Sequence, residues 1–125
     1  MGVLAYVPDL MDRSKLAAAA PDTTFVASPA ELVAAAVAAT VAAAEGAADE
    51  GAVAGGADGG ATLVVADLGR PGVLDALPAV VATGARVIGF GSHVDRSTLE
   101  AAAATGCEAM PRSQFFRSLG DLVNP

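Results

Sequence analysis

The stretch Ala61-Thr62-Leu63-Val64-Val65-Ala66-Asp67-Leu68-Gly69-Arg70-Pro71-Gly72 decides the fold of this chain. Four apolar residues in a row, Leu63 to Ala66, follow a glycine-rich segment and precede Asp67. An apolar run of this length, bounded by turn-forming residues, is typical of a β-strand that is buried on both faces of a sheet. The sequence therefore predicts a central strand over residues 63–67 with a single carboxylate at its carboxyl end.

The remaining strands and helices are predicted to alternate with this one along the chain. Strands are expected at residues 2–7, 23–27, 85–91 and 107–110, and helices at residues 10–20, 29–44, 75–83, 95–105 and 113–123. The helix at residues 29–44 has the clearest start, because Ser28 and Glu31 form a capping-box pair around Pro29 at the first helical position. Ser113 is expected to cap the last helix.

Five strands that alternate with five helices predict an α/β fold, a five-stranded parallel sheet between two layers of helices. The common strand order for such a flavodoxin-like fold is 2-1-3-4-5, and ligands bind beyond the carboxyl ends of the strands. That edge is expected to carry Asp9, Asp67, the Gly91-Ser92-His93 turn and Arg112. These residues are the candidates for a functional site.

Length and composition limit the possible functions. A chain of 125 residues fits one domain spanning residues 1–125. The net charge of −7 opposes binding to nucleic-acid phosphates, and the seven cations are scattered singly. The longest helical apolar run, residues 30–44, would span about 22 Å, too short for a hydrocarbon core of roughly 30 Å. One cysteine, Cys107, and no export signal favour a soluble, cytoplasmic protein.

An acidic segment at about residues 45–60 interrupts the alternation of strands and helices. It contains four acids, no cation and only one large apolar residue, Val53. Such a segment buries little apolar surface, so we expect a flexible loop. This loop leads into the central strand at the edge of the sheet that carries the amino ends of the strands, away from the candidate site.

The order of these elements and the residues around Asp67 resemble the receiver domain of two-component response regulators. Residues 63–72 are similar to the receiver run of apolar residues, phosphoacceptor aspartate, leucine, two variable residues, proline and glycine. Residues 87–93 and 105–108 are similar to the fourth strand and to the end of the following helix. The resemblance covers nearly the whole chain and implies a phosphoacceptor role for Asp67.

Four features of the receiver pattern are altered: the acid pair, the hydroxyl residue, the lysine and the switch aromatic. Val7 and Pro8 stand where receivers have two adjacent acids that hold Mg²⁺, and Asp9 follows one position later. Gly91 replaces the usual serine or threonine, although Ser92 is adjacent. The other two changes are Arg112 for the receiver lysine and Ala109 for the switch aromatic.

These changes predict a degenerate receiver that has lost Mg²⁺-dependent aspartyl phosphorylation. No cofactor or metal is then expected, and Asp9 and Asp67 are only weak metal-ligand candidates. Such a module would signal by contact, with a protein partner or a second copy of itself, and would not be an enzyme. Its contact face is predicted on the last strand and helix, around Ala109, Phe115 and Phe116.

Two other functions remain open from the sequence. A working phosphoacceptor with a rearranged pocket would use Asp9, Ser92 and Arg112 around Asp67, and would require Mg²⁺. A small flavodoxin-like enzyme or ligand-binding protein would use the same edge of the sheet. For single residues, we expect Asp67 to pair with Arg112 and Asp9 to cap the first helix.

Overall fold

The computed structural model describes residues 2–48 and 62–124. The elements in chain order are β1 (Gly2–Tyr6), α1 (Leu10–Ala19), β2 (Thr23–Phe25), α2 (Pro29–Ala48), β3 (Thr62–Asp67), α4 (Val73–Val81), β4 (Arg86–Gly91), α5 (Arg96–Ala104), β5 (Glu108–Pro111), α6 (Arg112–Arg117) and α7 (Leu119–Val123). Each predicted strand and helix is present, with ends that differ from the prediction by a few residues.

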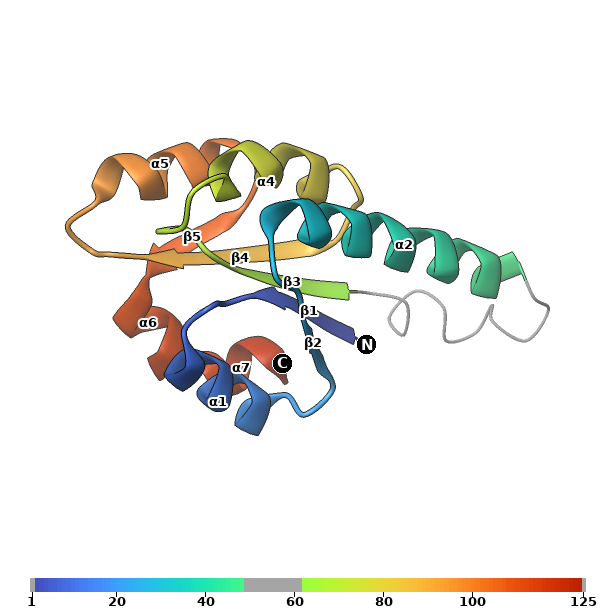
Figure 1. Cartoon of the computed structure of the whole chain (residues 1–125), viewed down its shortest axis with the longest axis horizontal. Helices are drawn as coiled ribbons and strands as arrows, with labels where there is room; N and C mark the ends of the chain where they lie inside the picture. The colour runs from blue at the N-terminus through green and yellow to red at the C-terminus, as the bar shows by residue number, and fades with distance from the viewer. Residues whose placement is uncertain (1, 49–61, 125) are drawn as a thin grey trace.

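The five strands form one parallel sheet in the order β2-β1-β3-β4-β5. Helices α2, α4 and α5 cover one face, and α1, α6 and α7 cover the other (Figure 1). The predicted three-layer, flavodoxin-like α/β fold is therefore confirmed. The carboxyl ends of β1, β3 and β4 lie together at one edge of the sheet. The direction in which the chain adds strands to the sheet reverses between β1 and β3.

The central strand β3 is buried on both faces, which explains its uninterrupted apolar run. Val64 and Ala66 pack into the core under α2, α4 and α5. Leu63 and Val65 pack on the opposite side, in the core under α1, α6 and α7. Asp67, the last residue of β3, lies at the end of both cores.

Helix α2 begins as predicted and ends later. The Glu31 backbone N–H donates to Ser28 Oγ at 3.1 Å, and the Ala27 N–H donates to Glu31 Oε2 at 2.9 Å. The helix continues to Ala48, so residues 45–48, predicted as loop, are helical; the alanines there favour the helix enough to include Gly46. Residues 49–60 of the predicted loop lie outside the described residues.

The α2 helix is long and rich in alanine. Even so, no helix within residues 2–48 and 62–124 has the length and apolar character needed to span a membrane.

The C-terminal helical region differs from the prediction at its start and in its middle. Ser113 does not cap it: the helix starts at Arg112, directly after Pro111, whose φ of −61° already suits the position before a first turn. The region is divided at Ser118 into α6 and α7. The apolar spacing still holds across the break, because Phe115, Leu119 and Val123 are all buried.

Leu68 turns the chain back over the sheet immediately after Asp67. Its backbone N–H donates to the Phe90 carbonyl oxygen at 2.8 Å, and its side chain is only 3% exposed. This packing requires a glycine at position 89, because a Cβ there would lie 2.6 Å from Leu68 Cδ2 and 2.8 Å from Leu68 Cγ. Gly89 therefore fixes the exit of the chain from β3.

Replacing Gly89 with alanine should destabilise the fold by about 1–3 kcal/mol, because the Leu68 side chain has to leave its packed position. Urea unfolding of Gly89→Ala measures this free energy. Gly120→Ala is the matched control, since a Cβ at Gly120 meets nothing within 4 Å. Equal stability of Gly89→Ala and wild type would contradict this packing argument.

Candidate functional site

A cleft of about 290 Å³ opens at the carboxyl edge of the sheet, beyond β3, β4 and β5. Its lining residues are Asp67, Gly69, Phe90, Gly91, Ser92, His93, Arg112 and Ser113. The structure thus brings Asp67, Gly91, Ser92 and Arg112 to one cleft, as the topology predicts. Asp9, the remaining pocket candidate, does not line it.

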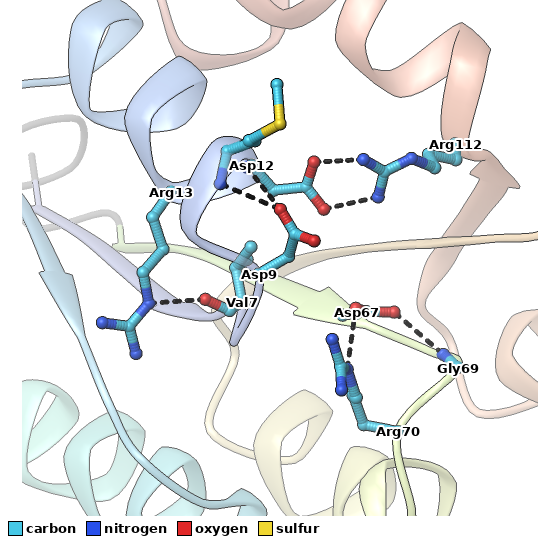
Figure 2. A network of polar contacts seen from close by, with 9 residues as sticks. Val7, Asp9, Asp12, Arg13, Asp67, Gly69, Arg70 and Arg112 are labelled. Carbon is cyan, nitrogen blue, oxygen red and sulfur yellow. Dashed lines mark hydrogen bonds and ion pairs between the residues drawn. The ribbon is translucent and has the colours of Figure 1, made fainter.

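Asp67 is held by groups of its own turn. Its Oδ1 accepts a hydrogen bond from the Gly69 N–H at 3.0 Å, and its Oδ2 pairs with Arg70 Nε at 3.3 Å (Figure 2). The Asp67 side chain is 13% exposed and that of Arg70 is 42% exposed. An ion pair this open to water adds little stability, but it occupies one carboxylate oxygen, and Gly69 occupies the other.

Arg112 binds a different carboxylate from the one predicted. Its two terminal nitrogens, Nη1 and Nη2, donate to the two carboxylate oxygens of Asp12 in a bidentate pair (Figure 2). The expected pair between Asp67 and Arg112 is therefore wrong. Asp12 is fully buried, and its hydrogen bonds to Arg112 raise the pKa of that guanidinium above its ordinary value.

Two aromatic rings also contact the same guanidinium. The Arg112 Cζ lies 5.8 Å from the centre of the Phe90 ring and 5.1 Å from that of Phe116. Lys15 Nζ also lies 5.1 Å from the centre of the Phe116 ring. Each contact is a cation–π interaction, so the head of Arg112 is fixed by a buried charge and by two rings.

Asp12 is the functional candidate that sequence reasoning missed. It lies in the first turn of α1, where an acid ordinarily compensates the helix dipole and faces water. Its spacing of four residues from Leu16 was the available signal, because residues four apart share a helix face and Leu16 is an obvious core residue. Within residues 2–42 and 62–124, Asp12 is the only charged residue that is buried.

Asp9 caps α1, as predicted. Its Oδ1 accepts hydrogen bonds from the backbone N–H groups of Met11, at 2.9 Å, and Asp12, at 3.1 Å. The pKa of Asp9 is lowered, chiefly by the hydrogen bond from Asp12; desolvation opposes this, and Met11, Arg112 and Arg70 add to the lowering. This cap positions the turn that carries Asp12.

The site offers a metal ion few ligands. Over residues 2–48 and 62–124, no three histidine, cysteine, aspartate or glutamate side chains come together in a group that could hold a metal ion. Asp9 is engaged with the α1 N-terminus, and Asp67 with Gly69 and Arg70. Divalent cations such as Mg²⁺ prefer several carboxylate or carbonyl oxygens at one point, which this arrangement does not supply.

The other polar candidates are in open or structural positions. Ser92 and His93 are exposed, and Ser92 Oγ accepts a hydrogen bond from the Val94 N–H at 3.3 Å. Gly91 is buried against Leu68 and Leu99.

The chain matches no protein-family model, no curated protein and no solved structure.

The predicted contact face is only partly on the surface. Phe115 is fully buried and stacks on Phe90 with ring centroids 4.8 Å apart. Phe116 and Ala109 are half-buried.

Cys107 is also buried, and desolvation raises the pKa of its thiol to about 11, so it is not a reactive thiolate at neutral pH.

The Asp9 cap predicts a pH-dependent contribution to stability that can be isolated with Asp9→Asn. Asparagine can also cap a helix but does not titrate. Because the pKa of Asp9 is lower in the folded chain than its ordinary value of 3.8, the charged cap stabilises the fold above that value, and this contribution is lost as the pH falls through the folded pKa.

Urea unfolding from pH 7 to pH 2.5 tests this effect on wild type and Asp9→Asn. The advantage of wild type over the variant should be constant near neutrality and shrink below about pH 4. A difference that stays the same down to the lowest pH would show that the charge of Asp9 is not part of the cap.

Proposed function

We propose that this chain is a receiver-like protein-interaction module that retains the phosphoacceptor position but not the phosphorylation chemistry. The observation that carries this proposal is the pair between Arg112 and Asp12. Arg112 occupies the position of the receiver lysine by resemblance, and its guanidinium is committed to a carboxylate on α1. It is therefore withheld from Asp67.

The energetics of the pair keep Arg112 in place. Phosphoryl transfer to a carboxylate depends on cations that neutralise charge as it develops on the phosphoryl oxygens. If Arg112 moved to a phosphate on Asp67, Asp12 would remain charged, unpaired and fully buried. Removing one partner of a fully buried ion pair costs about 3–5 kcal/mol, and here the cost is smaller because the Arg112 side chain is 47% exposed, but it still opposes the switch.

The missing acids weaken the chemistry further. Val7 is a buried apolar residue and Pro8 follows it, so neither supplies an oxygen ligand from its side chain. Asp9 is oriented by two backbone N–H groups of α1 rather than by the cleft. Without a metal ion or Arg112, the cation beside Asp67 is Arg70, which already pairs with Asp67 Oδ2 and is 42% exposed, so little is left to stabilise the charge of the transition state.

The proposed activity is contact with another protein or with a second copy of the chain. The core position of Phe115 removes it from the predicted contact face and leaves Ala109 and Phe116, both half-buried. No enzymatic step, nucleic-acid contact or membrane contact is part of this proposal. The net charge of −7 supports protein partners over polyanions.

The test is exposure of the purified chain to Mg²⁺ with acetyl phosphate, followed by intact-mass measurement, and to Mg²⁺ with beryllofluoride, followed by ¹⁹F NMR. We expect no phosphoryl adduct and no bound fluoride signal. Asp67→Asn is the matched control for either signal.

A stoichiometric adduct on wild type that Asp67→Asn abolishes would overturn the proposal and establish a working phosphoacceptor. Loss of that adduct in Asp9→Ala as well would identify Asp9 as part of a rearranged metal site. Either result would require that Arg112 leaves Asp12, or that a different cation neutralises the phosphoryl group in place of Arg112.

A further inference from the structure

The cleft at the carboxyl edge of the sheet presents both signs of charge to a ligand. Asp67 and Arg112 both line it, and Figure 2 shows each of them paired with a different partner. Each oxygen of Asp67 accepts one hydrogen bond, and Arg112 donates to Asp12 through Nη1 and Nη2. A carboxylate oxygen has a second lone pair, and a guanidinium has further N–H groups. A ligand can therefore contact both side chains while their ion pairs stay intact.

Phe90 lies beside both of these groups. It is in register with Asp67 on the neighbouring strand, so the two side chains project from the same face of the sheet. The Arg112 Cζ lies 5.8 Å from the centre of the Phe90 ring. The pKa of Arg112 is raised chiefly by its hydrogen bonds to Asp12, and the negative charge of Asp67 adds to this effect. A carboxylate and a guanidinium are thus close to the same aromatic residue inside one cleft.

Hydroxyl groups and an apolar wall complete the cleft. Ser92 and Ser113 line it and are exposed. Ser92 Oγ accepts a hydrogen bond from the Val94 N–H, so its own O–H can donate to a ligand. Phe90 is 1% exposed and stacks on Phe115, so this wall is ordered before any ligand binds. A few converging polar groups beside an apolar wall are typical of small-molecule sites.

Charge and size select the class of ligand. The ion pairs of Asp12 with Arg112 and of Asp67 with Arg70 leave these four groups without net charge. A phosphate ester would be repelled by Asp67, and a simple amine would be repelled by Arg112. The cleft volume of about 290 Å³ lies just under the range of about 300–1,000 Å³ that is usual for small-molecule sites. A small ligand that carries one charge of each sign meets both conditions.

We propose that the cleft binds a free α-amino acid in its zwitterionic form. The ammonium group of the ligand donates to the Asp67 carboxylate, and its carboxylate accepts from N–H groups of Arg112 and from the Ser92 hydroxyl. Hydrogen bonds between ionised groups are stronger than those between neutral groups. Binding is reversible, and no covalent bond forms or breaks. This inference rests on the proposed function, because it requires that Arg112 stays paired with Asp12 and that Asp67 stays unphosphorylated.

Titration of the ¹⁵N-labelled chain with each of the standard amino acids, followed by heteronuclear NMR, tests this site. We expect at least one amino acid to shift the backbone amide signals of residues 67–69, 91–93 and 112–113. Two probes with the same side chain then separate the charges: the carboxylic acid that lacks the amino group, and the amine that lacks the carboxylate. Each probe should bind at least about tenfold more weakly than the amino acid, because it loses one charge-assisted contact.

Asp67→Asn tests the assignment of the ammonium group to Asp67. The amide cannot balance the positive charge of the ligand, so the amino acid should bind about tenfold more weakly to this variant than to wild type. The carboxylic acid without the amino group should bind at least as tightly as to wild type, whereas a general loss of structure would weaken both ligands. Asp121→Asn is the matched control and should bind like wild type, because it removes one negative charge from an exposed residue of α7 outside the cleft.

The inference is overturned if no amino acid shifts the signals of the cleft, or if either probe binds wild type as tightly as the amino acid does. It is also overturned if Asp67→Asn binds the amino acid like wild type, or if Asp121→Asn weakens binding equally. A phosphoryl adduct on Asp67 is a separate result that would remove the proposed function. Failure of the titrations without such an adduct would remove the ligand and leave the proposed loss of phosphorylation in place.

Discussion

A buried carboxylate on α1 is the constraint on which the candidate site depends. Asp12 has no access to water, so its charge must be neutralised from within the fold, and Arg112 at the start of α6 does this. The two partners are unequal, because the Arg112 side chain is 47% exposed while Asp12 is fully buried. Loss of the arginine leaves a buried charge without a partner, whereas loss of the aspartate leaves a cation that water can reach.

The pair also joins two helices of the same layer beside the cleft. It links residues 12 and 112, and so ties the first helix to the C-terminal helices on one face of the sheet. The Asp9 cap holds the turn that carries Asp12, and Phe90 and Phe116 hold the guanidinium. Asp67 meanwhile pairs within its own turn, with Gly69 and Arg70. The cleft is thus lined by groups whose charges are already matched.

Local patterns predicted most of the fold. The apolar run before Asp67, the capping box at Ser28 and the alternation of elements gave the sheet order and the edge that carries the cleft. They did not give the partner of Arg112, because an acid in a first helical turn, such as Asp12, usually faces solvent and its pairing spans 100 residues of sequence. The Ser113 cap failed because a helix start at Arg112 depends on Pro111 and on that distant carboxylate.

Two double-mutant cycles in urea unfolding test the central claim, that Arg112 forms its ion pair with Asp12 and not with Asp67. One cycle combines Asp12→Asn with Arg112→Gln, and the other combines Asp67→Asn with Arg112→Gln. We predict a coupling free energy of about 1–3 kcal/mol for Asp12 with Arg112 and a value near zero for Asp67 with Arg112. A larger coupling of Arg112 with Asp67 than with Asp12 would contradict the account.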